Sequence, residues 1–133
     1  MASTTTVKGT DARVECIIPI LNVRNFSASI DYYVNVLGFR VEWDWGDPPD
    51  IGSVERDDYS IMLCENEQGH PGTWLWMGVE AAEEYYEEYR ASGAKIRETP
   101  INYPWAYEFR VEDLDGHVLR IGSAPKEDES HDH

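Results

Sequence analysis

The sequence contains few cysteines, few basic residues and no long hydrophobic run, and each of these absences excludes a class of protein. Its two cysteines, Cys16 and Cys64, are too few for a disulfide framework and lack the spacing of a metal-binding pair. No apolar run approaches the ~20 residues that a membrane-spanning helix needs. Residues 1–13 are polar and rich in threonine, unlike a signal peptide. We therefore expect a cytoplasmic protein with no membrane partner, in which both cysteines are buried, inert thiols.

The deficit of basic residues leaves a strongly acidic chain. Acidic side chains outnumber basic ones 26 to 11, so the formal net charge is −15 with neutral histidines. A field of this sign repels phosphate backbones, which argues against nucleic acid as a partner. The charge either serves solubility alone or attracts a cationic ligand. The hydrophobic fraction of 41% and the length of 133 residues are those of one ordinary globular domain.

One pattern of expected elements occurs twice along the chain. In each half a strand-like run precedes a helical pattern, whose apolar residues recur at i, i+3, i+4 and i+7 and are followed by a glycine. The first set is Ile30, Tyr33, Val34, Leu37 and Gly38. The second set is Ala82, Tyr85, Tyr86, Tyr89 and Gly93. Tyr33 and Tyr89 are 56 residues apart, as are Val23 and Val79 before the two helices. Tyrosine alternates with glutamate in the second helix, which predicts tyrosines facing the core.

The repeat predicts an α+β fold of two tandem βαβββ modules that form a curved mixed sheet around a cleft. Strands are expected at residues 13–24, 39–45, 51–56 and 59–64, and again at 73–79, 94–98, 107–111 and 117–122. Turn-forming residues separate them at 46–50, 57–58, 68–72 and 113–116. We expect a flexible N-terminus at 1–12, one domain at 13–124 with halves 13–65 and 73–124, and an acidic disordered tail at 125–133.

Four segments carry a resemblance to a known family. They are Pro19-Ile20-Leu21-Asn22-Val23, residues 29–39 (SIDYYVNVLGF), Pro104-Trp105-Ala106-Tyr107-Glu108-Phe109 and Asp113-Leu114-Asp115-Gly116-His117. Over residues 15–123 the sequence resembles the glyoxalase/bleomycin resistance/extradiol dioxygenase (vicinal oxygen chelate) superfamily, and within it most closely the bleomycin resistance proteins. It departs from their pattern in one loop, where Ala106 replaces glycine and one residue is missing. The resemblance implies paired βαβββ modules and a homodimer with shared binding clefts.

The positions that bind metal in that superfamily hold other side chains here. Metal-containing members use His or Gln in the first strand of each half and Glu in the last strand. The matching positions are Ile18, Met62, Trp74 and Arg120. None of these is a ligand that Zn²⁺, Ni²⁺, Mn²⁺ or Fe²⁺ takes in proteins. An error of one residue in matching the positions would not supply a ligand, because neighbouring side chains on a strand point to the opposite face of the sheet. We therefore predict no metal and no cofactor. The histidines fall in loops or in the tail, where we expect exposed, non-ligating side chains: His70, His117, His131 and His133.

Aromatic residues are what the expected cleft offers instead of a metal. The chain has five tryptophans, and Trp105 follows Pro104 in a loop, where a flat heteroaromatic ligand would gain about 1 kcal/mol from stacking. The resemblance implies that this tryptophan contacts the planar bithiazole of bleomycin. No nucleophile–base pair is suggested, so no catalytic residue is assigned. The candidate ligand-binding residues are Ile18, Trp43, Trp45, Met62, Trp74, Trp76, Tyr103, Trp105, Tyr107 and Arg120.

The sequence thus predicts a binding protein rather than an enzyme. It would sequester a bleomycin-like glycopeptide antibiotic, or more generally a small aromatic and cationic molecule, in an aromatic and acidic cleft without a metal. Two alternatives stay open. One is an enzyme of the glyoxalase-like superfamily, a lyase or a dioxygenase. The other is a protein that binds a different aromatic metabolite on the same scaffold.

Overall fold

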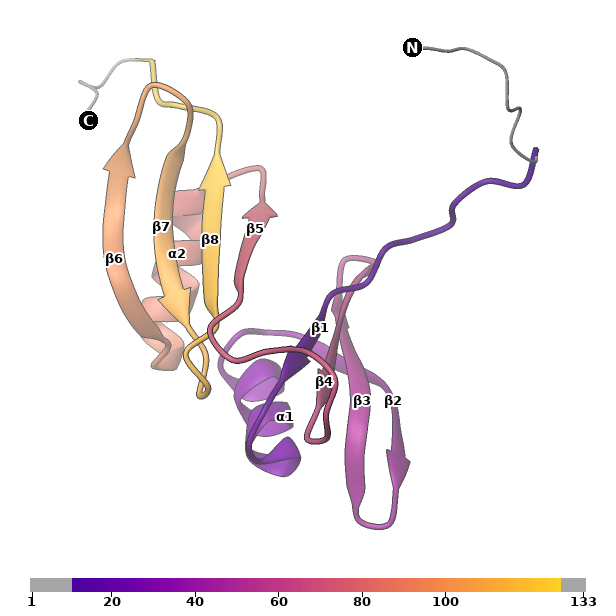
Figure 1. Ribbon diagram of the computed structural model, residues 1–133. Helices are drawn as coiled ribbons and strands as arrows, with labels where there is room; N and C mark the ends of the chain where they lie inside the picture. The colour runs from indigo at the N-terminus through magenta and orange to yellow at the C-terminus, as the bar shows by residue number, and fades with distance from the viewer. Residues whose placement is uncertain (1–10, 128–133) are drawn as a thin grey trace.

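The computed structural model describes residues 11–127, which form two βαβββ modules in tandem (Figure 1). The first module consists of β1 (Ile20–Asn22), α1 (Phe26–Asn35), β2 (Arg40–Gly46), β3 (Pro49–Arg56) and β4 (Tyr59–Cys64). The second consists of β5 (Trp74–Gly78), α2 (Ala82–Ser92), β6 (Lys95–Asn102), β7 (Tyr107–Glu112) and β8 (Val118–Ser123). The internal repeat and the α+β class predicted from the sequence are confirmed. Neither helix is long and apolar enough to span a membrane.

Each module contains one four-stranded mixed sheet. The strand orders are β1-β4-β3-β2 and β5-β8-β7-β6, so the two sheets have the same topology. In each sheet the first strand pairs in parallel with the last, and the remaining pairs are antiparallel. No strand pair joins the two sheets within the described residues, so the curved mixed sheet expected from the sequence is divided into two sheets. One helix packs on each sheet, and we call the other side of each sheet its open face.

The turn signals in the sequence correspond to real reversals of the chain. Gly38 and Gly93 follow the two helices with φ of 81° and 88°, the left-handed conformation that ends a helix. Asp57 and Asp58 have φ of 52° and 72°, which is the pair of positive values that a tight hairpin between β3 and β4 requires. These turns set the register that places residues on the open faces.

The first strand is much shorter than the sequence predicts. Only Ile20–Asn22 pairs with β4, and the segment before Pro19 runs away from the module (Figure 1). Proline has no backbone N–H and restricts the residue before it, so it interrupts the pairing at this point. The expectation that Cys16 is buried is therefore wrong, because Cys16 lies in this exposed segment. Cys64, on the inner strand β4, is fully buried as expected.

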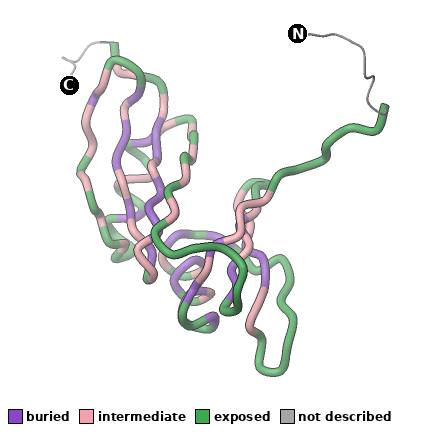
Figure 2. Tube along the Cα trace, viewed as in Figure 1, coloured by how far each residue is buried: buried purple, intermediate pink, exposed green. Residues whose placement is uncertain are grey.

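The two modules share one hydrophobic core, visible as the buried segments where they meet (Figure 2). The hydroxyl of Tyr89 on α2 donates to the carbonyl of Leu37 after α1, at 2.7 Å. The hydroxyl of Tyr33 on α1 donates to Asp113 in the β7–β8 turn, at 2.9 Å. Burial, together with the charge of Asp113, raises the pKa of Tyr33 well above its ordinary value. The repeated helix tyrosines thus join the modules, as well as facing the core as predicted.

His117 also joins the modules, contrary to the expected exposed position. Its side chain is completely buried. The backbone N–H of Thr73 donates to Nδ1 at 3.0 Å, which leaves the proton on Nε2 for the carbonyl of Asn22 at 2.6 Å. Because one ring nitrogen accepts and the other donates, His117 serves as a structural link between the start of β5 and the end of β1.

The chain ends are described only in part. Residues 1–10 and 128–133, which include the predicted tail histidines His131 and His133, lie outside the described residues. Lys126, at the start of the predicted tail, donates its backbone N–H to Asn102 at 3.0 Å and pairs with Glu83 at 2.6 Å. The first part of that segment therefore packs on the second module.

Candidate ligand-binding site

The open face of the second sheet presents aromatic and cationic side chains in register. Trp76 on β5 lies opposite Arg120 on β8, which in turn lies opposite Arg110 on β7. Residues opposite one another on adjacent strands point to the same face. Leu119 and Ile121, the neighbours of Arg120, are buried against the helix side. Trp76 is 52% exposed, so this face offers a large accessible aromatic surface.

Two glycines allow the indole of Trp76 to lie flat on the sheet. A Cβ atom added at Gly122 would collide with the six-membered ring of Trp76, and one added at Gly78 would stand 3.1 Å from its Nε1. The guanidinium of Arg120 lies 5.2 Å from the centre of the same ring, within cation–π distance. Trp76 is therefore held between the backbone of the sheet and a cation.

A buried carboxylate fixes this arrangement. Glu108 is 2% exposed and accepts two hydrogen bonds from Arg120, 3.0 Å from Nε and 2.8 Å from a terminal nitrogen. It also accepts from the indole Nε1 of Trp105 at 3.2 Å. Burial alone would raise the pKa of Glu108, but the hydrogen bonds from Arg120 and Trp105 outweigh it and lower the pKa. Glu108 is thus ionised at neutral pH and connects Trp105 to Arg120.

The loop before β7 positions Trp105 beside this network. The backbone N–H of Tyr103 donates to the carbonyl of Ala106 at 2.9 Å, which closes the loop despite its departure from the family pattern. The rings of Tyr103 and Trp105 stack with centroids 4.5 Å apart and an interplanar angle of 10°. Trp105 remains 59% exposed. Stacking and the bond to Glu108 orient an indole whose other face is accessible.

Trp74 is flanked by two guanidinium groups on the same open face. Arg97 and Arg110 lie 5.2 Å and 5.3 Å from the centre of its ring. Both arginines also pair with nearby glutamates at 3.4–3.5 Å. These glutamates offset the positive charge of the two arginines. The surface of indoles and guanidiniums is therefore nearly neutral and is not an anion site.

The open face of the first sheet is more acidic. Glu42 on β2 accepts hydrogen bonds from Ser53 on β3 at 2.7 Å and from Ser60 on β4 at 2.9 Å. These hydrogen bonds, from Ser53 first, lower the pKa of Glu42. Met62, two residues beyond Ser60, projects from the same face by strand alternation. Trp43 is paired with Ser53 and also faces this side.

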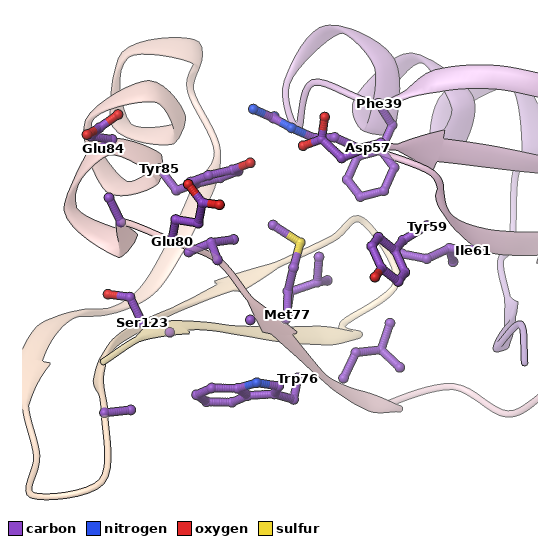
Figure 3. Close-up of a pocket in the computed structure, with 18 of the residues that line it drawn as sticks. Phe39, Asp57, Tyr59, Ile61, Trp76, Met77, Glu80, Glu84, Tyr85 and Ser123 are labelled. Atoms are coloured by element: carbon purple, nitrogen blue, oxygen red, sulfur yellow. The ribbon is translucent and has the colours of Figure 1, made fainter. Parts of the chain in front are cut away.

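A groove of about 1180 Å³ is lined by residues of both modules. Figure 3 shows Tyr59 and Ile61 of the first module on one side, facing Met77 and Trp76 of the second. Three carboxylates also line it, those of Asp57, Glu80 and Glu84. The groove is therefore lined by both apolar and acidic side chains. Its size suits a small-molecule site.

The candidate residues named from the sequence fall into separate groups. Trp76 and Trp105 line the groove, and Trp74, Arg120 and Tyr103 adjoin them on the second module. Met62, Trp43 and Trp45 belong to the first sheet, and Ile18 lies half-buried just before β1. Tyr107 lies elsewhere, because it packs against the core on the helix side of its sheet. A single chain therefore does not place all of the candidate ligand-binding residues in one cavity.

Sequence reasoning overlooked the polar groups that organise these aromatics. Glu108 directly precedes Phe109, an apolar residue expected to face the core, so strand alternation indicates that Glu108 faces the opposite side of the sheet. Glu42 gave no such signal. The register shift between Val41 and Trp43 places an extra residue on β2, and a bulge of this kind cannot be read from the residue types.

The four positions that the family resemblance associates with metal binding hold no set of metal ligands in this chain. Met62 pairs with Ile20, and Arg120 pairs with Trp76. Within residues 11–127, no group of three or more His, Cys, Asp or Glu side chains is placed to hold a metal ion. The site offers π surfaces, guanidiniums and carboxylates for non-covalent binding.

The comparison with protein families decides the membership of this chain. Residues 14–121 match the family described as the glyoxalase/bleomycin resistance protein/dioxygenase superfamily. The chain belongs to this superfamily. The membership inferred from the sequence motifs is thereby confirmed. No curated protein matches the chain.

Several solved structures share this fold at low sequence identity. An antibiotic-binding protein from Streptomyces sp. CB03234 superposes with a TM-score of 0.74 at 19% identity, covering 86% of this chain and 99% of that one. The bleomycin-binding protein from bleomycin-producing Streptomyces verticillus, complexed with copper(II)-bleomycin, gives 0.69 at 21% identity and covers 86% and 99%. A superfamily member from Sphaerobacter thermophilus gives 0.71 at 20% identity and covers 84% and 98%. This superfamily fold therefore includes proteins that bind antibiotics.

Proposed function

We propose that this protein sequesters a flat aromatic, cationic antibiotic of the bleomycin type, without a metal of its own, in the cytoplasm. The observation that carries the proposal is the ordered aromatic surface on the second module. Trp76 lies flat on glycine and Trp105 is tied to a buried carboxylate, yet about half of each side chain remains exposed. Indoles held rigidly in this way lose little conformational entropy when a planar ligand stacks on them.

The carboxylates that line the groove support a cationic ligand. Asp57, Glu80 and Glu84 face the cavity (Figure 3). Arg56, the cation in the same lining, is neutralised by two hydrogen bonds to Glu88 at 2.7 and 3.0 Å. The local charge is therefore negative, and it favours the approach of a positively charged group.

The distribution of the aromatic residues supports a homodimer. β1 and β5 each pair with a strand on one side only, so both sheets have an open edge beside the groove. Trp43 and Trp45, 42% and 73% exposed, lie on the first sheet, whereas Trp74 and Trp76 lie on the second. A second copy would bring a first-module face against a second-module face and complete a shared cleft. Light scattering should give twice the 15.3 kDa chain mass. A monomer at micromolar concentration would contradict this part of the proposal.

Titration with metal-free bleomycin, followed by tryptophan fluorescence, tests the function. We expect saturable quenching at micromolar drug and a loss of affinity in Trp105→Leu. Tyr107→Phe is the control, because Tyr107 lies on the opposite side of the sheet. This variant should bind bleomycin as the unaltered protein does. Absence of quenching by bleomycin would remove the bleomycin assignment.

Two further measurements address the alternative functions. A panel of other planar aromatic antibiotics distinguishes a different ligand on the same surface from no ligand at all. Elemental analysis of protein purified without an affinity tag addresses the enzyme alternative. Stoichiometric nickel, zinc, manganese or iron would overturn the metal-free proposal, since such a metal would need ligands other than the four family positions.

A further inference from the structure

We propose that Glu42, together with Trp43 and Trp45, forms a subsite for an organic ammonium group on the open face of the first sheet. This inference rests on the proposed function in that the subsite would hold the charged end of a bound ligand. Its residues lie on a different module from Trp76 and Trp105, and its chemistry can be tested separately.

A β-bulge places the Glu42 carboxylate on this face. Val41 pairs with Val54 and Trp43 pairs with Ser53, so Glu42 is the extra residue of the bulged strand. Bulges redirect a side chain relative to regular alternation. Two hydroxyls then hold the carboxylate, since Ser53 and Ser60 both donate to its Oε1 at 2.7 and 2.9 Å. Three adjacent strands thus cooperate to fix one exposed acid.

This carboxylate has no ion-pair partner in the part of the chain that the structure describes. The nearby Arg40 is occupied by Glu55, to which it donates two hydrogen bonds at 2.9 and 2.7 Å. Arg40 acts on Glu42 only through space, and the pKa of Glu42 is lowered chiefly by the hydrogen bonds from Ser53 and Ser60. Glu42 is therefore ionised at neutral pH, and its side-chain contact with Glu55 places a second acidic residue beside it.

Two exposed indoles stand on the same face of the sheet. Trp43 is opposite Ser53, whose hydroxyl contacts Glu42, and Trp45 is opposite Ile51, two residues from Ser53 on β3. Opposite residues share a face and alternate residues of one strand return to it, so both indoles lie on the side of Glu42. They are 42% and 73% exposed.

This combination selects an organic ammonium ion. The faces of indoles attract cations, and a carboxylate supplies the full counter-charge. Quaternary and alkylated ammonium groups suit such a site because they are weakly hydrated and apolar at their surface. The subsite is also continuous with the groove, because Ser60 both lines the groove and donates to Glu42. A ligand stacked in the groove can therefore extend its charged end to Glu42.

Choline and its neutral isostere 3,3-dimethylbutan-1-ol are the probes that test this subsite. Their binding is followed by the indole N–H signals of Trp43 and Trp45 in two-dimensional NMR spectra, assigned with Trp→Phe variants. We expect choline to shift these two signals in a saturable way and the neutral isostere to leave them unchanged. Equal shifts with both probes, or shifts confined to other tryptophans, would overturn the proposal.

Glu42→Gln removes the charge but keeps an oxygen that can accept from both serines. It should weaken choline binding about tenfold, whereas Glu87→Gln, an equal change of net charge on the exposed face of α2, should not alter it. Trp45→Leu, at a largely exposed position, provides a second variant that should also weaken binding. Unchanged affinity in Glu42→Gln and Trp45→Leu would refute the subsite.

A parallel titration with metal-free bleomycin separates this inference from the proposed function. If bleomycin fails to bind while choline binds through Glu42, the proposed function fails and the subsite stands. If bleomycin binds and choline does not, the function stands and the subsite fails.

Discussion

The indole Nε1 of Trp105 and the carboxylate of Glu108 are joined by a 3.2 Å hydrogen bond between a loop and the strand that follows it. The same carboxylate binds the guanidinium of Arg120, which lies over the ring of Trp76. A single buried acid therefore orients two exposed indoles that come from different segments of the second module.

Replacing Glu108 by glutamine should weaken both the fold and ligand binding. The change leaves Arg120, one third exposed, without its counter-charge and loosens the loop that carries Trp105. We expect a loss of about 1–3 kcal/mol in the free energy of unfolding, measured by urea denaturation. Glu87→Gln, whose exposed side chain pairs only with Arg90 among the salt bridges of the described residues, should change it by about 0.5 kcal/mol or less. Equal stability of the two variants would contradict the role of Glu108.

The stability that Glu108 contributes should depend on acid pH. Its pKa is lowered in the folded protein, so the unfolded chain takes up the proton first as pH falls. The contribution is complete above about pH 4.3, the ordinary glutamate value, and is lost as pH falls from there through the folded pKa. The difference in unfolding free energy between the unaltered protein and Glu108→Gln should therefore shrink between neutral pH and about pH 3. A difference independent of pH would show that the carboxylate charge does not act in this way.

Alanine at position 122 should displace Trp76. The added Cβ would collide with the six-membered ring of the indole. We expect a loss of about 1–3 kcal/mol from overpacking, together with a changed tryptophan fluorescence spectrum. Trp76→Leu should rescue much of the loss in the double variant because it removes the ring, whereas Trp74→Leu should not. Additive effects of Gly122→Ala and Trp76→Leu would count against the flat packing of the indole on the sheet.

His117→Leu should destabilise the protein although the histidine takes no part in binding. The variant leaves the N–H of Thr73 and the carbonyl of Asn22 without their histidine partner in a partly buried place. We expect a loss of about 2–4 kcal/mol in thermal or urea unfolding, because each unpaired buried group costs about 1–3 kcal/mol. His70→Leu, on the exposed linker, is the matched control and should be close to neutral. An equally mild effect of both substitutions would show that His117 does not connect the modules.

The sequence determined the repeat, the fold class and the superfamily. Apolar residues at helical spacing, with glycine after each helix, define α1 and α2, and the turn residues separate the strands. Tyr33 and Tyr89 illustrate why this worked, since a helix buries one face and its period is visible in residue types. The absence of metal ligands at Ile18, Met62, Trp74 and Arg120 was also readable, because it depends on side-chain chemistry rather than on contacts.

The tertiary structure alone decided how the site is organised. The residue type of Glu108 does not reveal that it is buried, because its partner Arg120 comes from the neighbouring strand β8. Glu42 reaches its open face through a bulge, which depends on pairing between strands. Cys16 is exposed because β1 begins only at Ile20, so the segment before it does not pair with β4. Each of these outcomes depends on how strands pair with one another, which the residue types along a single segment do not specify.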